Sequence, residues 1–180
     1  LLDAMDKMAR ACEHVQSQFL GVRTGRANAS LVERIPVEYY GATVPLQQLA
    51  TFQVPEARML IIKPHDRGSI AAIEKGIQAS DLGVTPGNDG VVIRLSFPML
   101  TEERRKEYVK VVKNMAEDGR IALRNVRRDA RKVLETSEKD GDISKDELDR
   151  AEKELDKLTQ EHVDQIEKAF VRKEQELLEV

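Results

Sequence analysis

The chain has 180 residues, of which 41% are hydrophobic and 34% are charged, and its formal net charge at pH 7 is −3. This length allows one ordinary domain or two small ones, and the high charge with only 4% aromatic residues indicates long exposed helices with narrow apolar seams. A single cysteine, Cys12, excludes an internal disulfide, and no run of about 18 apolar residues exists to span a membrane.

We expect a cytoplasmic protein, because the start of the chain carries charges where a signal peptide has its apolar run, and one cysteine fits a reducing compartment. The net charge conceals an uneven distribution. Residues 1–100 carry 10 basic and 10 acidic side chains, residues 101–135 carry 11 against 7, and residues 136–180 carry 8 against 15. A polyanion partner can therefore be argued for the basic segment although the whole chain is acidic.

The first 22 residues are predicted to form a helix, because apolar residues recur at alternating steps of four and three. The predicted seam, meaning the apolar stripe along one helix face, is Leu1, Met5, Met8, Cys12, Val15, Phe19 and Val22. Residues 30–98 have a different character, with short apolar runs, β-branched residues and spaced prolines that favour short strands.

Within this second segment, residues 65–83 are predicted to form one helix. Asp66 or Ser69 can cap its start, and the spacing of Ile70, Ile73 and Ile77 predicts its inner face. A turn at "PGNDG" then leads into a predicted strand, "VVIRLSF", at residues 91–97.

Two further helices are predicted after Pro98. The first covers residues 101–135 and has a seam at Val112, Ala116, Gly119, Leu123, Val126, Ala130 and Val133. "KDGD" ends it, and Ser144 with Glu147 forms a capping box that starts the last helix. Its apolar residues begin as a seam and then drift in phase, which predicts a stutter; they are Leu148, Ala151, Leu155, Leu158, Val163, Ile166, Phe170 and Leu177.

Three amphipathic helices that cannot bury their seams alone predict an antiparallel three-helix bundle. The fold class is therefore α+β: a bundle formed by residues 1–26 and 100–180, with a small β/α domain of residues 29–98 inserted into it. The chain crosses between the domains twice, near residues 26–29 and 98–101. We predict a hinge there, with the residues Ala27, Asn28, Pro98, Leu100 and Thr101.

The sequence offers little sign of catalysis, a metal or a cofactor. The three histidines are far apart and lack neighbours at metal-ligand spacing, and Cys12 occupies a seam position typical of a packed thiol. "DGDISKDE" lacks the glycine and the acidic ligand that an EF-hand loop needs. No glycine-rich loop has nucleotide-binding spacing. We therefore expect a protein that is not an enzyme and that holds no cofactor or metal.

The strongest feature is a row of arginines on the helix predicted for residues 101–135. On a helical wheel these side chains fall within an arc of about 100°, set about 115° from the apolar seam. Few acidic residues lie at helical spacing from them, so we expect them to face solvent largely unpaired and to favour phosphate, which matches the planar guanidinium group. This arginine stripe consists of Arg120, Arg124, Arg127, Arg128 and Arg131. A solvated face with salt bridges, or a scaffold that binds an acidic protein, remains an alternative.

Six segments together resemble the ribosome recycling factor family: "RTGRA" (23–27), "VEYYG" (37–41), "PLQQLA" (45–50), "SDLG" (80–83), "LTEERRK" (100–106) and "RNVRRDA" (124–130). They occur in the family's order over nearly the whole chain. The resemblance implies an L-shaped, two-domain protein with a flexible hinge. It also implies a monomer that binds the ribosome after termination and, with elongation factor G, separates the subunits so that messenger and deacylated tRNA leave.

The resemblance also implies which residues touch RNA. Arg105, Arg124, Arg127 and Arg128 match motifs whose basic residues contact large-subunit ribosomal RNA in the family. Arg23 and Arg26 of "RTGRA" are similar in kind. Arg120 and Arg131 join the prediction from the helical wheel alone. Two other classes of function remain open: a helical scaffold that binds an acidic protein, and an enzyme hidden in the β/α segment.

Overall fold

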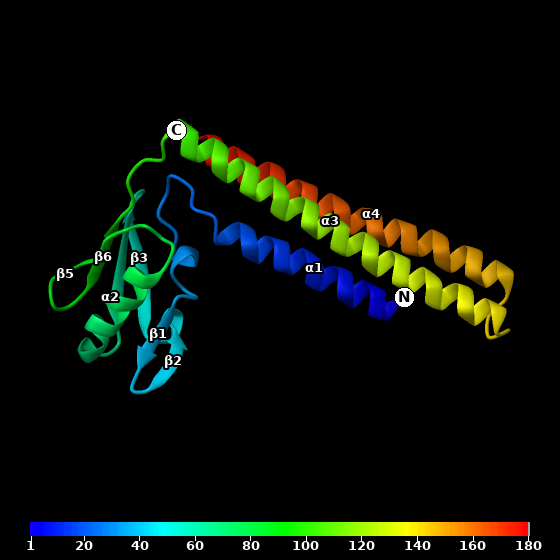
Figure 1. Cartoon of the computed structure of the whole chain (residues 1–180), viewed down its shortest axis with the longest axis horizontal. Coiled ribbons are helices and arrows are strands. Elements are labelled where there is room, and N and C mark those ends of the chain that lie inside the picture. The colour runs from blue at the N-terminus through cyan, green and yellow to red at the C-terminus, as the bar shows by residue number, and fades with distance from the viewer. Residues whose placement is uncertain (180) are drawn as a thin grey trace. The chain divides into compact units, whose positions relative to one another are not determined.

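The computed structural model describes residues 1–179 and divides them into two compact units (Figure 1). The bundle unit comprises Leu1–Phe19 and Glu107–Gln175, and the β/α unit comprises Leu20–Lys106 and the residues from Glu176 onward. This arrangement confirms the α+β class with a β/α segment inserted into a helical bundle. The predicted domain boundaries, hinge and L shape stay predictions. Within residues 1–179, none of the helices is long and apolar enough to cross a membrane.

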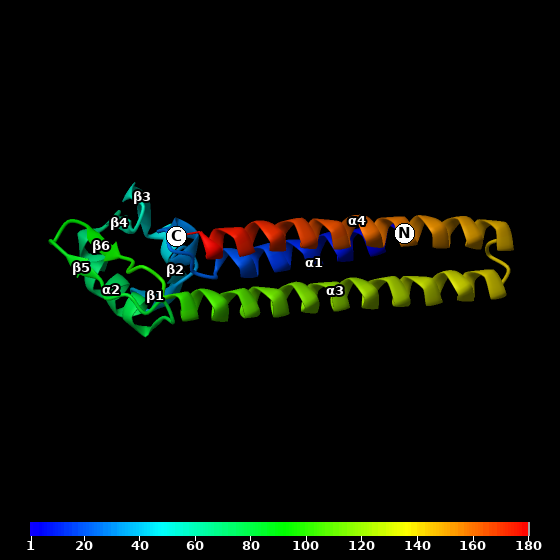
Figure 2. The same cartoon turned by 90° about the horizontal axis from the view of Figure 1, so that it is seen from above.

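Three helices form the bundle unit: α1 (Leu2–Leu20), α3 (Glu102–Lys139) and α4 (Lys145–Leu178) (Figure 2). The start of α1, at Asp3 and Ala4, lies against Val126–Val133 of α3, whereas Val15 of α1 lies against Gly119. Helix α1 is therefore antiparallel to α3. Helices α3 and α4 are joined by a tight turn in which Gly141 has a φ of +79°, so they are antiparallel as well.

The seam of α1 is as predicted from Met8 onward but not before it. Met8, Cys12, Val15 and Phe19 are buried, and Ala4 is buried in place of Met5. Leu1 and Met5 are 44% and 41% exposed. The predicted positions at the first turn are therefore wrong, because a step of four back from Met8 leads to Ala4 and leaves Met5 at the edge of the buried face.

The seam of α3 is buried at Val112, Ala116, Gly119 and Leu123 but not at its far end, where Val133 is 66% exposed. Helix α1 begins beside this region, so the remainder of α3 packs against α4 alone (Figure 2). The sequence pattern overestimated burial here because apolar spacing shows which face is available for packing and not how far a neighbouring helix extends.

The predicted drift in α4 is wrong, because the buried face is regular and includes polar residues. Thr159, His162 and Lys173 are 6%, 7% and 8% exposed and share that face with Leu155 and Ile166. The Thr159 hydroxyl donates to the Leu155 carbonyl at 2.8 Å, and a ring nitrogen of His162 lies 2.8 Å from the Leu158 carbonyl. Local hydrogen bonds thus make Thr159 and His162 tolerable in the core.

The three bundle helices approach one another closely at Gly119. A Cβ atom there would overlap the Cγ2 methyl group of Val15 on α1 and lie 3.1 Å from Cδ1 of Ile166 on α4. Glycine in a helix interior costs about 1 kcal/mol relative to alanine. The close packing of α1 and α4 against its backbone accounts for glycine at this seam position.

The β/α unit contains a hairpin of β1 (Pro36–Tyr39) and β2 (Ala42–Pro45) and a four-stranded antiparallel sheet. The sheet has the order β3-β4-β6-β5 and is formed by Ala50–Glu56 (β3), Met59–Pro64 (β4), Ile93–Ser96 (β6) and Gly87–Asn88 (β5). Helix α2 (Ile70–Ala79) packs beside β1, and three short 3-10 turns lie at Ala29–Leu31, Leu46–Gln48 and Arg67–Ser69.

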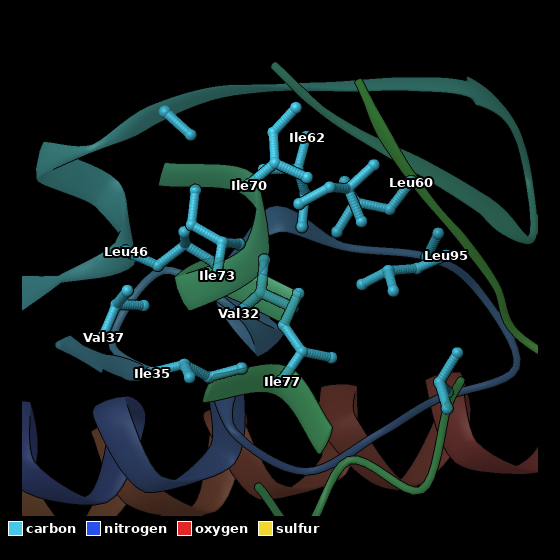
Figure 3. Packing of buried hydrophobic residues seen from close by; sticks show 14 of the residues in the cluster. Val32, Ile35, Val37, Leu46, Leu60, Ile62, Ile70, Ile73, Ile77 and Leu95 are labelled. Carbon is cyan, nitrogen blue, oxygen red and sulfur yellow. The ribbon is translucent and has the colours of Figure 1, made fainter. Parts of the chain in front are cut away.

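The core of this unit lies between α2 and the strands (Figure 3). Ile70, Ile73 and Ile77 point inward from α2, as the sequence predicts, and gather with Val32 and Leu46. Helix α2 starts directly after Ser69, one of the two predicted caps, and a 3-10 turn separates it from Asp66, the other. It ends at Ala79, before the predicted end near Gly83. Asp66 starts that turn by accepting a hydrogen bond from the Gly68 amide at 2.9 Å.

Both long helices after Pro98 begin at residues whose side chains cap them. The Thr101 hydroxyl oxygen accepts a hydrogen bond from the Arg104 amide at 3.1 Å. Ser144 and Glu147 form the predicted capping box: the Ser144 amide donates to the Glu147 carboxylate at 2.7 Å, and the Glu147 amide donates to the Ser144 hydroxyl oxygen at 3.1 Å. The hydrogen bonds from the Ser144 amide and hydroxyl lower the pKa of Glu147.

Candidate polyanion-binding surface

The arginine stripe lies on α3, within the bundle unit, and its five members differ in exposure. The side chains of Arg124, Arg128 and Arg131 are more than half exposed, and that of Arg127 is 40% exposed. Arg120 is only 18% exposed. The prediction of a solvent-facing stripe therefore fits four positions and is wrong for Arg120, which is largely covered and pairs with Glu167 of α4.

Each arginine of the stripe has a carboxylate neighbour, which corrects the prediction that the stripe is largely unpaired. Three of the acids lie on α3 itself. Glu117 lies 3.1 Å from Arg120 and 3.4 Å from Arg124, measured between guanidinium nitrogen and carboxylate oxygen. Asp129 pairs with Arg128 at 3.6 Å, and Glu135 pairs with Arg131 at 3.3 Å.

Three more acids reach the stripe from α4. The Asp156 carboxylate lies 2.8 Å from Arg127, the Glu152 carboxylate lies 3.3 Å from Arg131, and Glu167 pairs with Arg120. We call Glu152, Asp156 and Glu167 the acidic row. These residues flank the buried face of α4, where charged side chains of coiled coils pair between helices. A single helix cannot reveal them, because antiparallel packing of α4 brings them alongside α3.

These ion pairs leave the stripe available to other anions. Exposed pairs of this kind are each worth about 0–1 kcal/mol, because solvent screens them and side-chain entropy opposes them. Arg120 is held most firmly: its partial burial alone would lower its pKa, but hydrogen bonds to Glu167 and Glu117 raise the pKa overall. Arg124 and Arg128 are the most exposed, at 61% and 62%, and keep guanidinium donors facing solvent.

The remaining predicted RNA-binding residues, Arg23, Arg26 and Arg105, belong to the β/α unit. Arg26 is exposed and Arg105 is half-buried in the first turn of α3. Arg23 is half-buried and serves a structural contact that the sequence did not predict. Its guanidinium carbon lies 5.5 Å from the centre of the Phe97 ring, and its terminal nitrogen donates to the Pro98 carbonyl. Within the β/α unit, Arg23 thus connects the residues before Ala27 to the segment at Phe97 and Pro98.

Three of the predicted hinge residues are held by specific contacts. Ala27 is buried in the β/α core, and its amide donates to the Ala57 carbonyl at 2.7 Å. Asn28 caps a short turn by accepting a hydrogen bond from the Ser30 amide at 3.0 Å. Thr101 caps α3, as described above. A hinge in the first crossing would therefore need to bend before Ala27, and the hinge itself stays a prediction.

Replacing Arg23 by alanine is expected to destabilise the protein by about 1–2 kcal/mol, because a charged hydrogen bond and a cation–π contact are lost. Arg26→Ala is the matched control, since it removes the same charge from an exposed side chain three residues away. Urea unfolding followed by circular dichroism measures both. Equal stability of the two variants would refute the structural role of Arg23.

The histidines and the cysteine do not assemble a further site. Within the described part of the chain, no group of three or more His, Cys, Asp or Glu side chains could hold a metal ion. His14 and His65 are exposed, whereas His162 is buried beside its own helix backbone. Burial raises the pKa of the Cys12 thiol, which lies 3.5 Å from the His162 carbonyl oxygen. Cys12 is therefore a packed thiol, as its seam position predicts.

Comparison with known proteins identifies the family. A family model described as "Ribosome recycling factor" matches residues 15–178. The chain belongs to the ribosome recycling factor family. Ribosome-recycling factors of Kineococcus radiotolerans and Thermobifida fusca are each 54% identical to it over 180 residues, which is 100% of this chain and 97% of theirs. The family resemblance predicted from six sequence segments is confirmed.

Two solved structures have the same fold. A solution structure of a ribosome recycling factor matches with a TM-score of 0.81 and 42% identity, covering 98% of this chain and 94% of that chain. The second match has a TM-score of 0.70 and 42% identity, covering 99% of this chain and 96% of that chain. It comprises models for the T. thermophilus ribosome recycling factor and the E. coli elongation factor G bound to the E. coli post-termination complex.

Proposed function

We propose that this chain recycles ribosomes after translation termination. It binds the post-termination ribosome and, together with elongation factor G, promotes separation of the subunits and release of messenger and deacylated tRNA. The observation that carries this proposal is family membership over nearly the whole chain, with a structural relative that is bound with elongation factor G to a post-termination complex. Work on ribosomes would place the protein in the cytoplasm.

The arginine stripe is the proposed anchor on large-subunit ribosomal RNA. Arg124, Arg127 and Arg128 combine a family motif with exposure of 40% or more, so they are the strongest candidates. Arg131 is similarly exposed, whereas Arg120 is largely covered and contributes least. Arg105 and Arg26 are proposed as further contacts from the β/α unit. Guanidinium groups suit this role because they match phosphate with paired donors.

In the proposed mechanism the bundle unit holds the RNA and the β/α unit is the arm that elongation factor G moves. The chain passes between the units more than once, and paired connections resist twisting better than a single linker does. Arg23, which bonds one crossing to the other, would stiffen that connection. The free energy comes from GTP hydrolysis by elongation factor G, so this chain acts by binding and not as an enzyme.

A subunit-splitting assay tests this function directly. Purified post-termination ribosomes are mixed with elongation factor G and GTP, with and without this protein, and light scattering follows separation into subunits. Rapid separation is expected only with all three components, and replacing GTP by a non-hydrolysable analogue is the control. Separation that is no faster than with elongation factor G alone would contradict the proposal, and turnover of a substrate by the isolated chain would favour an enzyme.

A further inference from the structure

The arginine stripe contains two groups of arginines that differ in where their partners lie. Among residues 1–179, Arg124 and Arg128 pair only with carboxylates of their own helix, Glu117 and Asp129. Arg120, Arg127 and Arg131 pair with the acidic row on α4. In chain order, every second guanidinium of the stripe is therefore already matched by a carboxylate from the neighbouring helix.

The acidic row follows one edge of α4. On a helical wheel Glu152, Asp156 and Glu167 fall within an arc of about 60°, whereas Glu154 and Glu161 lie on the opposite side, about 180–200° from Glu152. Among the described residues, the latter two have no ion-pair partner. The helix thus separates acids that face the stripe from acids that do not.

We propose that the acidic row competes with RNA phosphate for the arginine stripe, so that the stripe binds tightly only to RNA that engages several of its arginines at once. The identity of the preferred RNA, that of the large ribosomal subunit, rests on the proposed function. The competition itself rests on the ion pairs between α3 and α4.

The physical basis is that a displaced carboxylate cannot leave. A counterion in solution gains entropy when phosphate replaces it, and this release drives RNA binding. Glu152 and Asp156 are fixed to α4 within a few ångströms of the arginines, so a phosphate that takes their place gains less and is also repelled. The separation is well inside the Debye length of about 8–10 Å at physiological salt, so this repulsion is only partly screened.

Competition of this kind weakens binding most for RNA that contacts few arginines of the stripe. RNA that touches one or two arginines must overcome the attached carboxylates with few new bonds. A surface that places phosphates along the whole stripe gains contacts with Arg124 and Arg128, which are free of α4 acids, and can then displace the row at the other positions. The acidic row would thus lower affinity for RNA in general and sharpen the preference for a matched RNA surface.

The test compares two double variants of equal net charge. Glu152→Gln with Asp156→Asn frees Arg131 and Arg127 from α4, whereas Glu154→Gln with Glu161→Gln removes the same charge from the opposite side. Binding of each protein to a generic RNA duplex, poly(A)·poly(U), and to purified large ribosomal subunits is measured at one ionic strength. Circular dichroism verifies that all proteins are folded.

We expect the first variant to bind the duplex about four- to twentyfold more tightly than wild type, since it removes two pairs and each is worth a factor of about two to five. Its preference for large subunits over the duplex is expected to fall, while the control variant changes less than twofold in that ratio. Equal duplex affinity for the two double variants would overturn the proposal.

Two safeguards keep the outcome decisive. If the double variant were not fully folded, the duplex affinities of the single variants Asp156→Asn and Glu161→Gln are compared instead. Asp156 is 59% exposed, so its replacement leaves no buried group without a partner. If wild type did not bind large subunits, the proposed function would fail, while the duplex comparison would still decide whether the acidic row competes for the stripe.

Discussion

Replacing Gly119 by alanine is expected to destabilise the protein by about 1–3 kcal/mol, the usual cost of inserting a methyl group into a packed core. Alanine is the better helix former by about 1 kcal/mol, so helix propensity alone predicts that this substitution would stabilise the protein. The new Cβ would overlap the Val15 methyl group and press on Ile166, so these packed side chains, or the helices α1 and α4 that carry them, must shift to admit it. Urea unfolding followed by circular dichroism measures the change.

A second-site variant separates this steric effect from other causes. Val15→Ala removes the methyl group that the new Cβ would meet, and by itself it should destabilise the bundle by leaving a cavity. In the Val15→Ala background, Gly119→Ala is expected to be neutral or stabilising, which gives a clear coupling in a double-mutant cycle. Stabilisation by Gly119→Ala in the wild-type background would show that the helices do not meet closely at this position.

The sequence predicts the bundle because apolar spacing is a direct consequence of helix geometry. The seam residues from Met8 to Phe19 in α1 and from Val112 to Leu123 in α3 follow that spacing, and they are buried. The pattern becomes unreliable where burial depends on something other than apolarity. Val133 is apolar yet exposed because α1 does not cover it, and Lys173 is charged yet buried. Neither fact can be derived from the spacing within one helix.

The sequence predicts where the arginine stripe lies on its helix but not which residues pair with its arginines. A helical wheel places Arg124, Arg127 and Arg128 on one face because the geometry is local. Their partners depend on the register between two antiparallel helices, which brings Asp156 beside Arg127 although 28 intervening residues separate them in the chain. The structural contact of Arg23 with Phe97 and Pro98 is also tertiary. The motif "RTGRA" indicates only that Arg23 is a basic surface residue.

Removing the centre of the stripe is expected to weaken binding to large ribosomal subunits by about a hundredfold or more, because each lost phosphate contact costs up to about a factor of ten near physiological salt. The variant is Arg124→Ala, Arg127→Ala and Arg128→Ala combined. Its folding should change little, since the lost pairs are exposed. The matched control replaces three lysines of α4 that lie away from the acidic row: Lys153, Lys157 and Lys168.

The salt dependence of that binding is the most direct measurement of the central claim, that the arginine stripe anchors the protein to ribosomal RNA phosphate. Affinity for purified large subunits is measured for wild type, the triple arginine variant and the lysine control over a range of salt concentrations. The arginine variant should show a slope of log affinity against log salt that is shallower by about two to three units, while the control keeps the wild-type slope. An arginine variant with unchanged affinity and slope would contradict the claim.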